Sequence, residues 1–319
     1  MHLCGMKGMK IVFMGTPAFA VASLQAILNR GFEVVGVVTV PDKPAGRGQK
    51  LMTSAVKDFA LAHQLPILQP VKLKDPDFLQ QLANLNADLF VVVAFRMLPK
   101  EVWQMPEKGT INLHGSLLPK YRGAAPIHWA IIQGEKETGV TTFFINEEID
   151  MGHIIEQRTF PIPPNATLGE IHDEMMTIGG EALCSTLSLI AEGKAHPKPQ
   201  SHWIEKGVEA CAARKLSKEV AKIDWHQSNQ KIHDFVRGMS PFPCAWTTLE
   251  DKQVKVFQGE IANDLSAGNI GEWKTDGRTR LSFKTTDGWY NILSLQFEGK
   301  KKMEVVEFLR GWKPKTPQS

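Results

Sequence analysis

Up to about residue 192, short continuous apolar runs alternate with longer stretches in which apolar residues recur every three or four positions. The short runs are typical of strands buried on both faces, and the longer stretches are typical of helices that cover a sheet. The expected strands are Lys10–Met14, Glu33–Val40, Leu89–Ala94, Thr110–Leu113 and Val140–Ile145. The expected helices are Phe19–Leu28, Thr53–His63, Asp77–Ala83 and Ala125–Ile132. This alternation predicts a Rossmann-like α/β fold, with a doubly wound and mostly parallel sheet that binds ligands beyond the carboxyl ends of its strands.

The pattern changes after about residue 192. Residues 193–211 are rich in histidine and proline and show no sustained apolar period, which is typical of a linker. A helix is expected at Asn229–Met239, and several short strands separated by Gly-, Asp- and Lys-rich turns predict a small OB-like β-barrel. These strands are Ala245–Leu249, Gln253–Phe257, Gly268–Trp273, Arg280–Thr285 and Tyr290–Gln296. The expected organisation is a catalytic domain at 9–192, a linker at 193–211 and a C-terminal domain at 212–319.

The overall charge of +3 is unevenly distributed along the chain. Residues 206–319 hold 19 Lys and Arg against 14 Asp and Glu, a net charge of +5, whereas residues 1–205 hold 18 against 20, a net charge of −2. This excess in the C-terminal part favours an anionic partner such as a nucleic acid. The alternative is a basic surface that only keeps the protein in solution.

Several classes of protein are disfavoured by what the sequence lacks. No apolar run approaches the roughly 20 residues of a membrane helix, and residues 1–8 hold no apolar stretch long enough for a signal peptide. The four cysteines lie far apart without a Cys-x-x-Cys pair, which favours a reducing compartment such as the cytoplasm. The histidines show no metal-ligand spacing, so we expect no metal.

Asn112 and His114 lie two residues apart at the end of an expected strand. Their side chains should therefore leave the same face of the sheet at its ligand-binding edge. An amide donor beside an imidazole suits acyl transfer to an amine, because the amide stabilises negative charge on the carbonyl oxygen while the imidazole handles a proton. The structural alternative is that Asn112 caps a turn and that His114 is a hydrogen-bonded core residue.

Asp150 follows the expected strand that ends at Ile145, in a loop that would open on the same edge. A carboxylate there could hold the imidazolium form of His114. The alternative is an ordinary aspartate in a turn before Gly152. Its occurrence together with Asn112 and His114 favours a catalytic role.

The residues that follow His114 are candidates for binding a flat aromatic cofactor. Small and apolar residues at a strand edge allow such a ligand to lie against main-chain groups. The alternative is a plain loop that leads into a helix. The candidates are Ser116, Leu117, Leu118 and Pro119.

A glycine-rich basic loop follows the second expected strand and carries Lys43, Arg47 and Lys50. Three cations on such a loop suit a phosphate backbone, and the alternative is a solvated surface loop. The loop lacks the spacing of a phosphate-cradling P-loop. The turn after the first expected strand, at residues 15–17, also lacks the Gly-x-Gly-x-x-Gly pattern, which disfavours a dinucleotide-dependent oxidoreductase.

From Met9 to about Gly311 the sequence resembles the family of 10-formyltetrahydrofolate-dependent formyltransferases. The stretch from Asn112 to Pro126 is highly specific for folate-dependent formyl transfer, although several kinds of formyltransferase share it. Further matching segments are Phe-Met-Gly-Thr-Pro at 13–17, Pro-Asp-Lys-Pro-Ala-Gly-Arg-Gly at 41–48, Glu-Thr-Gly-Val-Thr at 137–141, Asp150, and Lys-Leu-Ser-Lys-Glu with Ile-Asp-Trp across 215–225.

The resemblance implies a role for each candidate. Asn112, His114 and Asp150 would form the catalytic trio, and residues 116–119 would line the site of 10-formyltetrahydrofolate. Arg47 and its loop would reach the acceptor end of initiator methionyl-tRNA, and the C-terminal domain would hold the tRNA stem. A monomer without a metal would then transfer the formyl group to the α-amine of methionine by direct amine attack.

Three other functions compete with this one. A formyltransferase for a nucleotide-linked amino sugar also has a small C-terminal barrel, but its relatives lack the Pro-Ala-Gly-Arg-Gly loop found at 44–48. A glycinamide ribonucleotide formyltransferase would end after the first domain. A non-catalytic RNA-binding protein would explain the basic second domain but would leave the Asn112, His114 and Asp150 set without a purpose.

Overall fold

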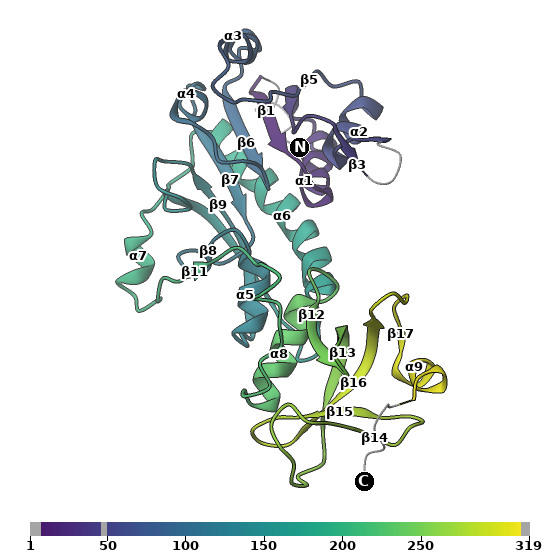
Figure 1. Cartoon of the computed structure of the whole chain (residues 1–319). Coiled ribbons are helices and arrows are strands. Elements are labelled where there is room, and N and C mark those ends of the chain that lie inside the picture. The colour runs from purple at the N-terminus through teal and green to yellow at the C-terminus, as the bar shows by residue number, and fades with distance from the viewer. Residues whose placement is uncertain (1–7, 46–49, 314–319) are drawn as a thin grey trace. The chain divides into compact units, whose positions relative to one another are not determined.

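The structure is a computed structural model that describes residues 8–45 and 50–313. The chain forms two compact units (Figure 1). The α/β unit comprises residues up to 123 together with 139–160 and 172–212, and the half-barrel unit comprises 124–138, 161–171 and the chain from 213 on. Each unit thus draws on several segments, whereas the expected domain boundaries at 192 and 211 follow the chain. Those boundaries stay a prediction.

The α/β unit is built on a seven-stranded sheet with the order β10-β9-β7-β6-β1-β2-β5. Strands β5, β2, β1, β6 and β7 are parallel, and β9 runs antiparallel to β7. The central strands are buried almost throughout, as their continuous apolar runs predict. The expected mostly parallel sheet is therefore confirmed. The strands are β1 (Lys10–Gly15), β2 (Glu33–Val38), β5 (Ile67–Leu68), β6 (Leu89–Val93), β7 (Thr110–His114), β9 (Glu137–Phe144) and β10 (Ile154–Pro161).

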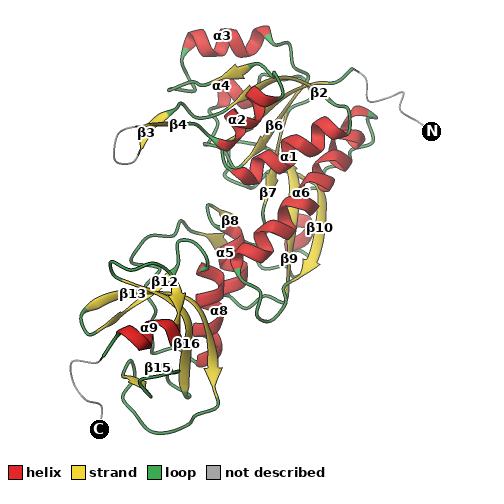
Figure 2. Ribbon diagram, turned by 90° about the vertical axis from the view of Figure 1, so that its right-hand side faces the viewer, coloured by secondary structure: helices red, strands yellow, loops and turns green. Residues whose placement is uncertain are grey.

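The longest helix, α6 (Leu168–Ala191), has no counterpart among the expected elements. Two adjacent glycines lie in its middle and allow it to approach its neighbours closely. A Cβ atom on Gly179 would lie 2.9 Å from Leu113 of β7, and one on Gly180 would lie 2.9 Å from Ala26 of α1. Helices α1 and α6 therefore lie side by side (Figure 2). The other helices of this unit are α1 (Ala18–Asn29), α2 (Ala55–Ala62), α3 (Pro76–Asn84), α4 (Lys100–Trp103) and α7 (Ser201–Ile204).

The half-barrel unit contains an antiparallel sheet with the order β12-β13-β16-β15-β14, and β17 pairs with β16. Its core includes Tyr290 and the stacked rings of Trp225 and Phe283, whose centroids are 4.6 Å apart. A small second domain of antiparallel strands is thus confirmed. The elements are α5 (Pro126–Ile132), α8 (Asn229–Met239), β12 (Ala245–Leu249), β13 (Lys252–Ala262), β14 (Trp273–Thr275), β15 (Leu281–Lys284), β16 (Trp289–Phe297), β17 (Met303–Glu304) and α9 (Val305–Gly311).

One expected strand of this unit is wrong in its position. Residues 268–272 form a loop, and β14 begins only at Trp273. Gly271 has a φ of +82°, which lies outside the strand region. A Cβ atom on Gly268 would lie 2.8 Å from the ring of Trp289, so this glycine allows the loop to pass close over that ring. The two glycines therefore mark a close approach and a turn rather than a strand.

None of the helices formed by residues 8–45 and 50–313 is both long enough and apolar enough to cross a membrane.

Candidate active site

Asn112 and His114 both lie on β7, at its carboxyl end. The register places Asn112 between Val92 of β6 and Phe143 of β9, so it occupies the middle of the sheet. Because side chains alternate along a strand, Asn112 and His114 point to the same face. The Asn112 side chain is half-buried, and none of the described residues forms a hydrogen bond with it. Its amide group is therefore available to a ligand.

The imidazole of His114 is only 6% exposed and has a defined orientation. Its Nε2 lies 2.8 Å from the main-chain oxygen of Tyr121. A carbonyl oxygen can only accept, so Nε2 carries a proton and donates this hydrogen bond. The other ring nitrogen, Nδ1, is then the one that can take up or release a proton.

The carboxylate of Asp150 lies next to this second nitrogen. Its Oδ2 is 3.8 Å from His114 Nδ1 and accepts a hydrogen bond of 2.8 Å from the main-chain N–H of Gly123. A separation of 3.8 Å is too long for a hydrogen bond, so the carboxylate interacts with the ring through its charge. The structure thus brings together His114 and Asp150, which are far apart in the sequence.

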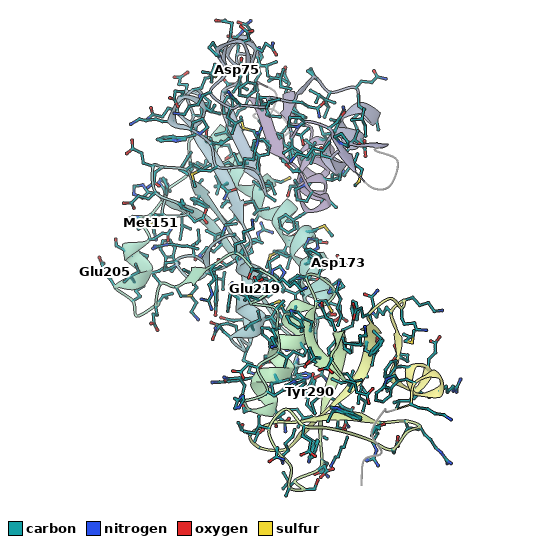
Figure 3. All side chains as sticks on the ribbon, in the orientation of Figure 1. Asp75, Met151, Asp173, Glu205, Glu219 and Tyr290 are labelled. Atoms are coloured by element: carbon teal, nitrogen blue, oxygen red, sulfur yellow. The ribbon has the colours of Figure 1, made fainter. Side chains whose placement is uncertain are left out.

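The loop that carries Asp150, between β9 and β10, is constrained at two points (Figure 3, where the neighbouring Met151 is labelled). Asp150 has a φ of +55°, a left-handed conformation that aspartate tolerates better than most residues. A Cβ atom on Gly152 would lie only 1.6 Å from the main-chain oxygen of Phe144. Only glycine fits there, and this close approach sets the path of the loop.

The four residues expected to bind the folate, Ser116, Leu117, Leu118 and Pro119, come one residue after the end of β7. All except the half-buried Leu117 are buried. The main-chain oxygen of Ser116 accepts a hydrogen bond from the Thr141 hydroxyl, whose oxygen accepts one in turn from the main-chain N–H of Leu118. This segment is therefore held firmly by the fold. Its part in folate binding stays a prediction.

Arg96 follows β6, the strand next to β7. Its guanidinium donates to the main-chain oxygens of Pro70 at 2.8 Å and of Val71 at 3.1 Å. Partial burial lowers the pKa of this guanidinium, which nevertheless remains charged at neutral pH. Its buried Nε–H has no hydrogen-bond partner among the described residues. An unpaired buried donor at this edge fits a ligand that supplies an acceptor atom.

The basic loop forms a hairpin of β3 (Lys43–Ala45) and β4 (Lys50–Met52). Lys43 is exposed on β3 and Lys50 begins β4, whereas Arg47 lies outside the described residues. The base of the hairpin is anchored by Asp42, which forms an ion pair with Lys57 and accepts a hydrogen bond from Gln69. These two partners hold the pKa of Asp42 below its usual value. Of the hairpin residues whose side chains the structure describes, Lys43, Pro44, Leu51 and Met52 are all exposed.

A cavity of about 610 Å³ lies within the half-barrel unit. Lys218 and Lys222 approach the ring of Trp246 at 5.7 and 5.6 Å from its centroid. Cations grouped with aromatic rings are typical of surfaces that bind nucleic acids. The residues that line the cavity are Ala124, Ala125, His128, Lys215, Leu216, Ser217, Lys218, Ala221, Phe242, Pro243, Cys244, Trp246, Gln253 and Lys255.

The described residues provide neither a metal cluster nor, at Cys184 and Cys244, an activated thiol. None of their His, Cys, Asp and Glu side chains forms a group that could hold a metal ion. Cys184, Cys211 and Cys244 are free thiols. Burial raises the pKa of Cys244 to about 12, and burial likewise raises that of Cys184, so both remain protonated and poorly nucleophilic at neutral pH.

The class of protein with this fold, and with these side chains at the edge of the sheet, is identified by comparison with known protein families. Residues 9–187 match the family described as formyl transferase, and residues 215–313 match the formyl transferase C-terminal domain. The chain therefore belongs to the formyltransferase family.

Its curated relatives within the family include methionyl-tRNA formyltransferases. The chain is 48% identical over 311 residues to the methionyl-tRNA formyltransferase of Bacteroides fragilis, which covers 96% of both proteins. It is 46% identical over 310 residues to the one from Flavobacterium johnsoniae, which covers 96% of this chain and 97% of the relative.

Solved structures with the same fold come from more distant proteins. HypX from Aquifex aeolicus matches with a TM-score of 0.65 at 23% identity, over 96% of this chain and 48% of that one. An N-formyltransferase from Helicobacter canadensis also matches with a TM-score of 0.65 at 20% identity, over 92% of this chain and all of that one. At these identities the likeness concerns the fold alone.

The contact between Asp150 and the Gly123 N–H leads to a first prediction. Replacing Asp150 with Ala removes a charged acceptor, and hydrogen bonds to charged groups contribute about 1.5–3 kcal/mol. We therefore expect the Gly123 amide to exchange its hydrogen about tenfold faster or more, as measured by amide hydrogen exchange. Asp77→Ala, an exposed change on α3, serves as the control and should leave this rate unchanged. Equal rates at Gly123 in Asp150→Ala and in the unsubstituted protein would contradict the contact.

Proposed function

We propose that this protein transfers the formyl group of 10-formyltetrahydrofolate to the α-amino group of methionine on initiator tRNA, for the start of protein synthesis. The observation that carries the proposal is the 48% identity to a methionyl-tRNA formyltransferase along nearly the whole chain, half-barrel unit included. The arrangement of Asn112, His114 and Asp150 supports the proposal, because it suits the oxyanion stabilisation and proton transfer that formyl transfer to an amine requires.

In the proposed mechanism the amine attacks the formyl carbon directly, and no residue of the chain forms a covalent intermediate. Negative charge grows on the formyl oxygen as the carbon becomes tetrahedral. The half-buried amide of Asn112, without a partner among the described residues, donates a hydrogen bond to that oxygen. Removing a donor of this kind typically slows turnover by about 100- to 1000-fold.

His114 handles the proton in this reaction. The attacking amine becomes positively charged and must lose a proton before the carbon–nitrogen bond to the folate breaks. Nδ1 of His114 accepts that proton, because Nε2 already donates to Tyr121. The same imidazolium can then protonate the departing folate nitrogen. The formyl donor, the acceptor amine and the imidazole would all be held in fixed positions. Much of the increase in reaction rate would therefore come from their orientation.

Asp150 stabilises the charge that His114 gains. Its carboxylate lies 3.8 Å from Nδ1, within the distance at which opposite charges favour one another, and both side chains are shielded from water. The hydrogen bond that this carboxylate accepts from the Gly123 N–H fixes its position beside the ring. In this mechanism Asp150 tunes His114 and transfers no proton itself.

We propose that the folate lies at the carboxyl edge of β6 and β7, next to Ser116, Leu117, Leu118 and Pro119. The unpaired Nε–H of Arg96 supports this place, because a folate carries several carbonyl and carboxylate acceptors. No metal takes part in the proposal.

The tRNA would be held by two basic regions. The basic loop with Lys43, Arg47 and Lys50 would meet the phosphates at the acceptor end. The basic cavity beside Trp246 supports a role of the half-barrel unit in tRNA binding. The net charge of +5 on residues 206–319 agrees with this division. We further propose that the protein acts in the cytoplasm. We also propose that it acts as a monomer, because one chain carries both the catalytic trio and the two basic regions.

The nearest rival is formyl transfer to a nucleotide-linked amino sugar. The Helicobacter canadensis protein was solved with folinic acid and dTDP-3-aminofucose and has the same fold. Its identity to this chain is 20%, however, whereas the relatives named for methionyl-tRNA reach 48%.

The choice of acceptor is tested by supplying 10-formyltetrahydrofolate with one of three amines in parallel: initiator methionyl-tRNA, glycinamide ribonucleotide or an amino-sugar nucleotide. We expect rapid formylation of the methionyl-tRNA alone, followed by the release of tetrahydrofolate. Preference for either small nucleotide would overturn the proposal.

The roles of the trio are tested by Asn112→Ala, His114→Ala and Asp150→Ala. We expect each to lower turnover by about 100-fold or more, because each removes oxyanion stabilisation or proton transfer. The exposed changes Asp77→Ala and His196→Ala serve as controls and should leave turnover unchanged. Near-normal turnover in any one of the three variants would remove that residue from the catalytic set.

If the basic loop binds the tRNA, its loss should affect the use of tRNA and leave the use of folate unchanged. In Arg47→Ala we expect a higher KM for methionyl-tRNA, an unchanged KM for the folate and a salt dependence of tRNA binding that is shallower by about one unit of slope. Arg30→Ala, an exposed change at the end of α1, is the matched control. Identical tRNA kinetics across a salt series for Arg47→Ala and the unsubstituted protein would rule out the phosphate contact.

A further inference from the structure

Gln200 lies in the segment that the sequence predicts to be a linker, yet its side chain is almost completely buried in the α/β unit. It is only 4% exposed. Burying a carboxamide is unfavourable unless its donors and its acceptor are all paired. The partners that Gln200 finds therefore show why a polar side chain is kept at this position.

The carboxamide of Gln200 bridges Arg122 and the Asp150 loop. Its Nε2 donates to the main-chain oxygens of Asp150 at 2.8 Å and of Gly152 at 3.1 Å. Its Oε1 accepts from Nε and Nη2 of Arg122 at 3.0 and 2.7 Å. A guanidinium can only donate and a carbonyl oxygen can only accept, so the orientation of the amide is determined by its partners.

This bridge holds the strained part of the loop. The two oxygens that Gln200 binds belong to Asp150, which has the left-handed conformation, and to Gly152, which approaches the main chain of Phe144 closely. A conformation of this kind persists only when its surroundings hold it. The guanidinium of Arg122 also polarises the amide and strengthens the hydrogen bonds on its far side.

The short strand β8 (Arg122–Gly123) is connected to Asp150 in two ways. Arg122 acts on its main chain through Gln200, and the N–H of Gly123 binds its carboxylate at 2.8 Å. Strand β8 pairs in turn with β11 (Ala212–Ala213), and the N–H of Arg122 donates to the main-chain oxygen of Cys211. Both ends of the 200–211 segment are thus connected to the Asp150 site.

We propose that Gln200 and Arg122 are positioning residues for the catalytic aspartate. They hold the main chain at Asp150 so that its carboxylate faces Nδ1 of His114, and neither touches the reacting groups. This inference rests on the proposed function, in which Asp150 stabilises the charge on His114. The segment at 193–211 is, on this view, a part of the catalytic apparatus as well as a connection.

The inference is tested with two substitutions of Gln200. Gln200→Ala removes the bridge, and Gln200→Glu keeps the shape and the contact with Arg122 but places a carboxylate oxygen against the oxygens of Asp150 and Gly152. We expect kcat to fall about 10- to 100-fold in both, since a displacement of about 1 Å has effects of this size. The KM for each substrate should stay within about twofold. Gln80→Glu, an exposed change on α3, is the matched control and should retain full activity.

A double-mutant cycle separates positioning from a general loss of structure. If Gln200 acts through Asp150, then Gln200→Ala should cost less than about threefold in a chain that already carries Asp150→Ala. Equal losses in both backgrounds would overturn the inference, as would full activity of Gln200→Glu. Thermal unfolding of each variant identifies any that fail to fold, and Gln200→Glu then provides the cycle in place of Gln200→Ala.

A measurement that does not depend on catalysis tests this inference separately from the proposed function. The Gly123 amide donates to Asp150 Oδ2, so a displaced loop should speed its hydrogen exchange in Gln200→Ala and Gln200→Glu but not in Gln80→Glu. If the unsubstituted protein formylates none of the three amines, the proposed function fails while this measurement still tests the bridge. Unchanged exchange at Gly123 in both Gln200 variants would show that Gln200 does not position Asp150.

Discussion

The candidate site depends on one steric constraint, the contact between Gly152 and the main-chain oxygen of Phe144. A side chain at residue 152 would overlap that oxygen, so the loop after β9 turns sharply only because glycine stands there. The turn places Asp150 in a left-handed conformation and its carboxylate 3.8 Å from His114. The position of Asp150 beside His114, on which the proposed chemistry relies, is therefore possible only because residue 152 has no side chain.

Around this turn the protein uses main-chain groups to orient ionisable side chains. The main-chain oxygen of Tyr121 sets which nitrogen of His114 carries the proton, and the N–H of Gly123 binds the Asp150 carboxylate. Tyr121 lies in a turn and Gly123 in the short strand β8, where the N–H of Arg122 donates to the main-chain oxygen of Cys211. Main-chain groups held in this way orient a buried imidazole and carboxylate at little further entropic cost. The proposed chemistry belongs to the α/β unit, while the cavity beside Trp246 belongs to the half-barrel unit.

The expected fold was confirmed where the signal was strong and local. Continuous apolar runs placed β1, β2, β6 and β7 within one or two residues, and the amphipathic pattern placed the helix at Asn229–Met239 with the bounds that the structure has. The long helix α6 was missed, and Gly179 and Gly180 in its middle serve close packing against Leu113 and Ala26 rather than helix propensity. The strand expected at 268–273 was wrong because its glycines serve a turn and a contact with Trp289.

By itself the sequence determined which side chains are candidates for the chemistry, since Asn112 and His114 share a strand face whatever surrounds them and the motif at 112–126 carries the family likeness. Only the tertiary structure decided how they are held. Tyr121, Gly123 and the carbonyl oxygens of the Asp150 loop act through main-chain atoms, which are alike in every residue and leave no pattern in a sequence. Gln200 does contribute a side chain, but in a segment without periodicity its burial against Asp150 arises from contacts between residues 50 positions apart. Such long-range contacts form only when the whole unit folds.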